Sequence, residues 1–82
     1  IELNPDDANV FNDRGVVLTK LNRFDEAFQF HDKVVQLNPD DAMAFINRGI
    51  VLHELNRFDD ALESYGKAIQ LDSDYQLAYQ NL

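Results

Sequence analysis

The chain has 82 residues, of which 45% are hydrophobic and 27% charged, and it contains no cysteine. This length allows one small domain with a modest core, and the lack of cysteine excludes disulfides and thiolate metal ligands. A net charge of −8 argues against binding to nucleic acid or anionic membranes, and no apolar run approaches the roughly 18–20 residues of a membrane span. We therefore expect a cytoplasmic protein that needs no cofactor or metal and whose partners are neither nucleic acid nor membrane.

Two amphipathic helices are predicted in the first half of the chain. Apolar side chains recur at spacings of three and four residues over 10–21 and again over 27–37, which is the period of one helix face. The sequence LNRFD at 21–25 interrupts this phase, and it predicts a tight turn between two antiparallel helices.

The second half of the chain repeats the first. Residues 8–41 align with residues 42–75 without a gap, with 16 identical residues among 34, and the pentapeptide NPDDA occurs at 4–8 and 38–42. A fixed period of this length is the mark of a helical solenoid. We expect residues 1–7 to end a preceding repeat and residues 76–82 to begin the first helix of a third, so that the chain is a fragment of a longer array.

Each repeat is expected to open with a capped helix. Asn38 is predicted to be the N-cap and Pro39 the first helical residue, with Asp40 and Asp41 in the first turn, where the helix dipole favours negative charge. The same roles are expected for residues 4–7 and, in a version without proline, for residues 72–74.

Two glycines lie at equivalent positions inside the predicted helices, where glycine costs about 1 kcal/mol relative to alanine. Their recurrence at Gly15 and Gly49 predicts a close approach between the two helices of each repeat. Ala27 and Ala61 are expected to supply the small opposing surface.

These features together resemble the tetratricopeptide repeat, a helix–turn–helix unit of 34 residues. The first helix of each unit carries an aromatic residue, a glycine and a large apolar residue, at Phe11, Gly15 and Leu18 and at Phe45, Gly49 and Leu52. The second helix carries the remaining family positions, at Phe24, Ala27, His31, Val34 and Pro39 and at Phe58, Ala61, Tyr65, Ala68 and Ser73. This sequence departs from the family in an arginine before each glycine, in His31 for an aromatic, in Val34 for a small residue and in Ser73 for proline.

The resemblance implies an all-α fold, a right-handed superhelical solenoid of antiparallel helix–turn–helix units that forms one domain over 1–82. The repeats would span 8–41 and 42–75, with the first helix of each lining a concave groove. The groove positions of the family correspond here to Asn12, Asp13, Val16, Met43, Ile46, Asn47, Ile50 and Asn81. Met43, Ile46 and Ile50 would form an exposed apolar surface, and Asn47 and Asn81 would hold the backbone of an extended peptide.

Two functions fit this pattern. One is a scaffold that binds an extended peptide or protein segment in the groove, and the alternative is a structural unit that self-associates through its uncapped terminal helices. The basic clamp with which some family members hold a C-terminal carboxylate is not expected, since its positions carry residues such as Asn12 and Leu77. His31 is expected to pack in the core and His53 to face solvent, and without a catalytic motif no enzyme is expected.

Overall fold

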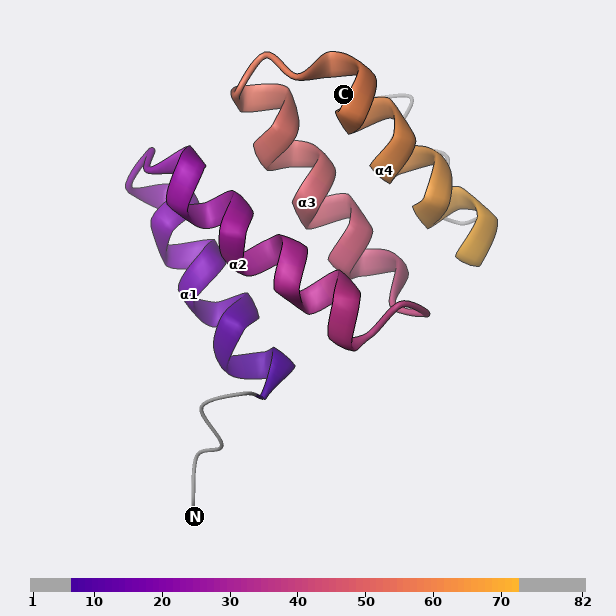
Figure 1. The fold of residues 1–82 in the computed structure, drawn as a ribbon, viewed down its shortest axis with the longest axis horizontal. Coiled ribbons are helices and arrows are strands. Elements are labelled where there is room, and N and C mark those ends of the chain that lie inside the picture. The colour runs from indigo at the N-terminus through magenta and orange to yellow at the C-terminus, as the bar shows by residue number, and fades with distance from the viewer. Residues whose placement is uncertain (1–6, 73–82) are drawn as a thin grey trace.

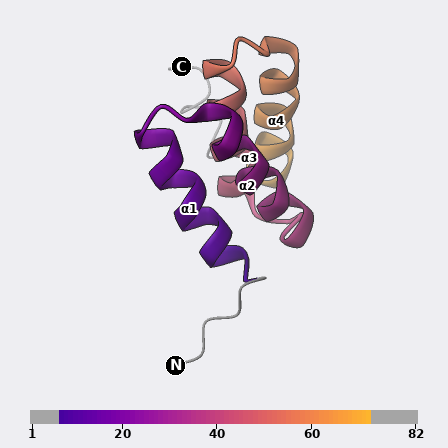
Figure 2. The same ribbon diagram turned by 60° about the vertical axis from the view of Figure 1, so that its left-hand side comes forward.

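The computed structural model describes residues 7–72, which form four α-helices (Figure 1). No strand occurs within these residues. The four helices are α1 (Ala8–Lys20), α2 (Phe24–Leu37), α3 (Ala42–Glu54) and α4 (Phe58–Leu71). Each helix packs against its neighbours in sequence, so that α1 lies at one end of the stack and α4 at the other (Figure 2). The all-α helical repeat expected from the sequence is confirmed.

The predicted turn between the helices of each repeat is present twice with the same geometry. Asn22 and Asn56 adopt left-handed backbone angles, with φ of 61° and 62°. Asparagine tolerates this conformation better than most residues. The next amide, from Arg23 or Arg57, donates back to Leu18 or Leu52 at 2.9 Å and so closes the helix end.

The helix starts differ from the prediction, because the second aspartate of NPDD is the N-cap. Asp41 accepts hydrogen bonds from the Met43 and Ala44 amides, and Asp7 caps α1 in the same way. Asn38 instead ends α2, and its carbonyl accepts from the Asp41 amide at 3.2 Å. Pro39 thus occupies the second position of a β-turn, where its fixed φ is equally suitable. The other two caps were predicted at residues 4–7 and 72–74. Of these, residues 4–6 and 73–74 lie outside the described residues.

The close approach at the two glycines is confirmed, but the opposing surface is an aromatic ring. A Cβ added to Gly15 would lie 2.7 Å from His31 Nε2, and one added to Gly49 would lie 2.6 Å from Tyr65 Cε1. The expectation that Ala27 and Ala61 are the opposing residues was therefore wrong. Each glycine makes room for the large ring of its own repeat, and the alanines fill the core elsewhere.

His31 is a core residue, as expected, and His53 is exposed. The imidazole of His31 is only 2% exposed, and its Nδ1 has no hydrogen-bond partner. Burial lowers the pKa of His31 below 6.5, and a backbone hydrogen bond at Gly15 acts in the opposite direction. The folded protein therefore favours the neutral ring.

We predict opposite effects for alanine at two glycines. Gly49→Ala should lower the free energy of unfolding by about 1–3 kcal/mol, because the new methyl group displaces the buried Tyr65 ring. Gly66→Ala should raise it by up to about 1 kcal/mol, because no atom lies within 4 Å of the added Cβ and alanine favours the helix. Urea denaturation followed by circular dichroism measures both. Equal effects at the two positions would contradict the steric role of Gly49.

We also predict that His31 makes stability depend on pH. The pKa of His31 is lower in the folded chain than in the unfolded one, so below pH 6.5 the unfolded chain binds a proton that the folded chain resists. The contribution of the neutral His31 ring to the free energy of unfolding is complete above pH 6.5. It is lost as the pH falls from 6.5 towards the pKa of His31 in the folded chain. Compared with His31→Phe, the wild-type chain should lose stability between pH 7.5 and 5 in urea titrations. The control His53→Gln should retain the wild-type profile, and parallel profiles for wild type and His31→Phe would refute the prediction.

Candidate functional site

The first helices of the two repeats border a small hollow. It measures about 160 Å³ and is lined by Val16, Thr19, Lys20, His31, Asn47, Ile50 and Val51. Three of the groove residues expected from the sequence therefore meet at one place, namely Val16, Asn47 and Ile50. Its aliphatic lining residues are Val16, Ile50 and Val51, and the exposed Lys20 contributes a charged side chain.

An amide pair joins the two sides of the hollow. Asn47 Nδ2 donates to Asn12 Oδ1 at 3.2 Å, which links α3 to α1 across 35 residues of sequence. The bond uses one donor of Asn47 and one acceptor of Asn12, so both carboxamides keep further hydrogen-bonding groups. The hydroxyl proton of Thr19 is committed to the Gly15 carbonyl at 2.8 Å. The polar groups that line this hollow and keep hydrogen-bonding capacity are therefore those of Lys20, His31 and Asn47, with Asn12 next to Asn47.

Other groove candidates lie elsewhere. Ile46 is only 7% exposed and belongs to a core cluster with Leu52 and Tyr65, so the expectation that it faces solvent was wrong. Its helix, α3, lies between α2 and α4, and more of its circumference is buried than in α1. Met43 is exposed as expected but does not line the hollow.

The two remaining groove candidates do not add to this hollow. Asp13 lines a different hollow, on the side of α1 that faces away from α3. Asn81, which was expected to act together with Asn47, lies outside the described residues. The sequence periodicity did not separate the different sides of α1 and α3, on which these candidates lie.

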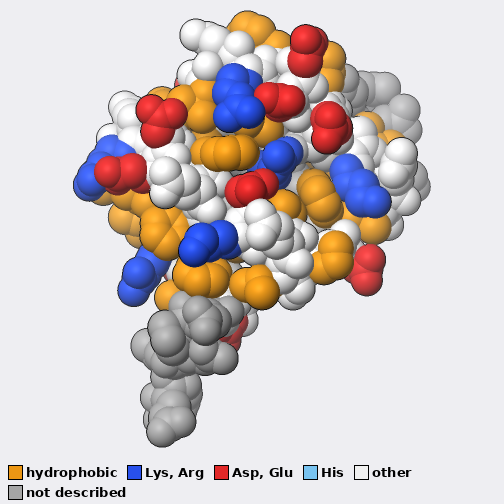
Figure 3. All heavy atoms as spheres, viewed as in Figure 1, with side chains coloured by type: hydrophobic (Ala, Val, Ile, Leu, Met, Phe, Trp, Pro, Cys, Tyr) orange, Lys and Arg blue, Asp and Glu red, His pale blue; other side chains and the backbone are white. Residues whose placement is uncertain are grey.

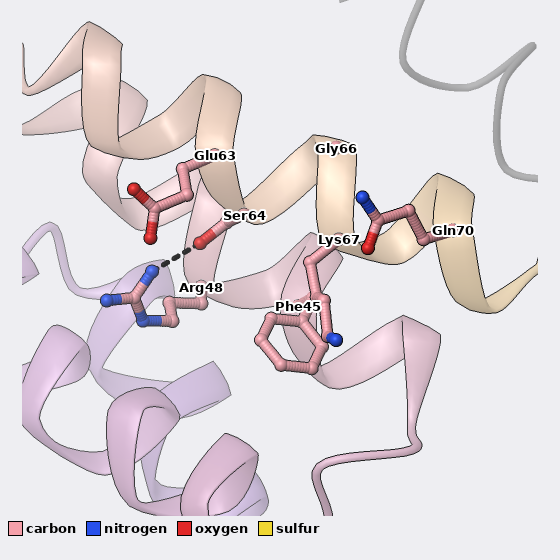
Figure 4. Close-up of a pocket in the computed structure, with 7 residues that line it drawn as sticks. All are labelled: Phe45, Arg48, Glu63, Ser64, Gly66, Lys67 and Gln70. Carbon is pink, nitrogen blue, oxygen red and sulfur yellow. Dashed lines mark hydrogen bonds between the residues drawn. The ribbon is translucent and has the colours of Figure 1, made fainter.

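Sequence reasoning did not identify the network around Arg48. Its Nε donates to Asp32 Oδ1 at 2.9 Å, and its Nη1 donates to the buried Ser64 hydroxyl (Figure 4). One side chain of α3 thus ties α2 to α4. The sequence feature that could have indicated this network is the arginine before each glycine, where the family usually has leucine.

A further hollow lies beside the Arg48 network, between α3 and α4 (Figure 4). It measures about 520 Å³ and is lined by Phe45, Arg48, Glu63, Ser64, Gly66, Lys67 and Gln70. In Figure 4 the Arg48 guanidinium points towards Ser64, and Glu63 lies beside it. Nε and Nη1 of Arg48 are thus both used to join helices beside this hollow.

Two kinds of feature are absent from the part of the chain that the structure describes, namely metal-binding groups and membrane-spanning helices. No group of three or more His, Asp or Glu side chains in residues 7–72 could hold a metal ion. Acidic, basic and hydrophobic side chains are interspersed over the face shown in Figure 3. None of the described helices has the length and apolar character needed to cross a membrane.

Comparison with known proteins agrees with the geometry. The family model described as Tetratricopeptide repeat matches residues 8–41 and 42–75, the two helical pairs described above. A comparison with curated proteins gave no significant match. Tetratricopeptide repeats are generally protein–protein interaction modules and typically serve as non-enzymatic scaffolds. Since the matches cover most of its length, the chain belongs to the tetratricopeptide repeat family.

Proposed function

We propose that this chain binds an extended segment of a protein partner in the groove between α1 and α3. The observation that carries the proposal is the convergence of Val16, Asn47 and Ile50 on one hollow. Each of the two 34-residue units, 8–41 and 42–75, contributes its first helix, and residues 76–82 would begin the next such helix of the same domain.

The residues that line the hollow indicate which side chains and backbone groups the bound segment would present. A volume of about 160 Å³ is close to that of a cavity of about 150 Å³ that accepts a benzene-sized group. One apolar side chain of the partner would occupy it, in contact with Val16 and Ile50. The carboxamides of Asn12 and Asn47 would pair with the partner's backbone, since an amide both donates and accepts. Lys20 on the rim favours an acidic neighbour to that side chain.

The remaining groove candidates have secondary roles in this proposal. Met43 and Asn81 would extend the contact surface along the groove and Ile46 supports it from the core, whereas Asp13 lines the other hollow and takes no part. The function is that of a scaffold without a catalytic step, and it needs no cofactor.

We predict that an arginine in the hollow weakens this binding. A peptide display library selected against the wild-type chain should yield a motif with a conserved apolar residue. Val16→Arg should weaken the selected peptide about 10- to 100-fold, because burial of one aliphatic side chain contributes about 1.5–3 kcal/mol. Isothermal titration calorimetry measures the affinities, and circular dichroism verifies that the variant stays helical.

The matched control is Gln29→Arg, which adds the same side chain at an exposed position of α2 outside the hollow. It should bind like the wild type. Asn47→Ala tests the backbone contacts and should weaken peptides of different sequence to a similar degree. Equal binding by the wild type and Val16→Arg would rule out the groove between α1 and α3 as the site.

A further inference from the structure

The side chain of His31 has an unpaired nitrogen in the interior of the protein. The imidazole is only 2% exposed, and within residues 7–72 its Nδ1 is the one buried side-chain nitrogen or oxygen that has no hydrogen-bond partner. Such a group costs the folded chain free energy, because water pairs with it in the unfolded chain. Folded proteins contain few groups of this kind, so the unpaired Nδ1 indicates a missing partner.

Packing alone does not account for a histidine at this position. The equivalent residue of the second repeat is Tyr65, whose ring lies against Gly49 as the ring of His31 lies against Gly15. Both rings are buried, and the ring of tyrosine contains no nitrogen. An aromatic ring without a buried polar ring atom therefore satisfies the contact with the glycine.

His31 also forms part of the hollow between α1 and α3. The ring lines this hollow, and its very low exposure places it at the bottom rather than at the edge. Two other lining residues have nothing to offer to Nδ1. Val51 is aliphatic, and the hydroxyl proton of Thr19 is donated to the Gly15 carbonyl at 2.8 Å. A partner for Nδ1 would therefore be supplied by whatever occupies the hollow.

The position of the ring proton decides what Nδ1 can bind. Nε2 is the ring atom nearest to Gly15, 2.7 Å from the position of an added Cβ, and the ring forms a hydrogen bond with the backbone of Gly15. Because a backbone carbonyl accepts, this contact assigns the proton of the neutral ring to Nε2. Nδ1 is then an acceptor, and its missing partner is a hydrogen-bond donor.

The size and the walls of the hollow narrow the choice of donor. Its volume of about 160 Å³ is close to the roughly 150 Å³ of a cavity that accepts benzene, and Val16 and Ile50 give it aliphatic walls. A water molecule is a poorer occupant, since it needs about two to four polar partners. A cationic side chain would place its charge beside Lys20. A neutral aromatic ring that carries a hydroxyl group meets both requirements.

We propose that the hollow between α1 and α3 binds a tyrosine side chain of the partner segment, whose phenol hydroxyl donates to Nδ1 of His31. The identity of this side chain rests on the proposed function, which places one apolar group of the partner in the hollow. The ring of the tyrosine lies between Val16 and Ile50, and its hydroxyl supplies the donor that Nδ1 lacks. His31 thus distinguishes tyrosine from phenylalanine.

The test compares two forms of one peptide. The peptide selected against the wild-type chain is synthesised with tyrosine or with phenylalanine at its conserved position, so that the two forms differ by one oxygen atom. In isothermal titration calorimetry the wild-type chain should bind the tyrosine form about 3- to 10-fold more tightly, the gain expected for one hydrogen bond between neutral groups. The selection itself should enrich tyrosine over phenylalanine at this position.

A matched pair of histidine variants tests the role of Nδ1. His31→Phe removes the acceptor but keeps a ring against Gly15, as Tyr65 does against Gly49. It should bind the phenylalanine peptide at least as tightly as the tyrosine peptide, because the phenol would be buried without an acceptor. His53→Phe makes the same exchange at an exposed position outside the hollow and should keep the wild-type preference. Circular dichroism verifies that both variants stay helical.

Nitrogen NMR observes the hydrogen bond without any substitution in the chain. With ¹⁵N-labelled histidine, the free protein at neutral pH should show His31 as a neutral ring protonated at Nε2. The tyrosine peptide should move the Nδ1 signal of His31 to lower frequency, because the lone pair becomes engaged. The phenylalanine peptide should leave this signal close to its position in the free protein.

The results distinguish a failure of the tyrosine site from a failure of the groove. If Val16→Arg weakens both peptides but the wild type binds them equally, the groove stands and the tyrosine site is refuted. If the wild type and Val16→Arg bind both peptides equally, the groove is not the site and both proposals fail. A tyrosine preference that persists in His31→Phe would also overturn the proposal, since Nδ1 would then not be its source.

Discussion

The structure depends on the contact between a glycine of one helix and a ring of the next. Gly15 faces His31 and Gly49 faces Tyr65, at distances that leave no space for a Cβ. This contact sets how closely the two helices of each repeat approach. Alanines such as Ala27 and Ala61 then fill the remaining core, and the turns at Asn22 and Asn56 repeat with nearly identical φ. The same pair of helices is therefore built twice from sequences that share fewer than half their residues.

Packing between the repeats is different in kind, because it relies on polar side chains at partly buried positions. Arg48 joins Asp32 of α2 to Ser64 of α4 and stacks on Phe28. An arginine can do this because its guanidinium donates in several directions and its flat face stacks on a ring. The interface thus carries directional contacts as well as apolar burial, and these contacts specify which helix fits.

The proposed docking surface lies on the side of α1 that borders α3. It combines aliphatic residues with the Asn12–Asn47 pair, which suits an extended backbone and one apolar side chain.

The sequence alone determined the helical pairs, their turns, the place of each glycine and the burial of His31. These features depend on contacts within one repeat, and both residues of each contact belong to the same 34-residue unit. Only the tertiary structure decided that Ile46 is buried, that Asp41 rather than Asn38 caps α3, and that Val17 is exposed while Val51 is not. The difference between Val17 and Val51 depends on which helix lies alongside in the stack, and identical residues cannot report a difference in their neighbours. The cap depends on how Pro39 directs the chain between repeats, a choice that local preferences leave open.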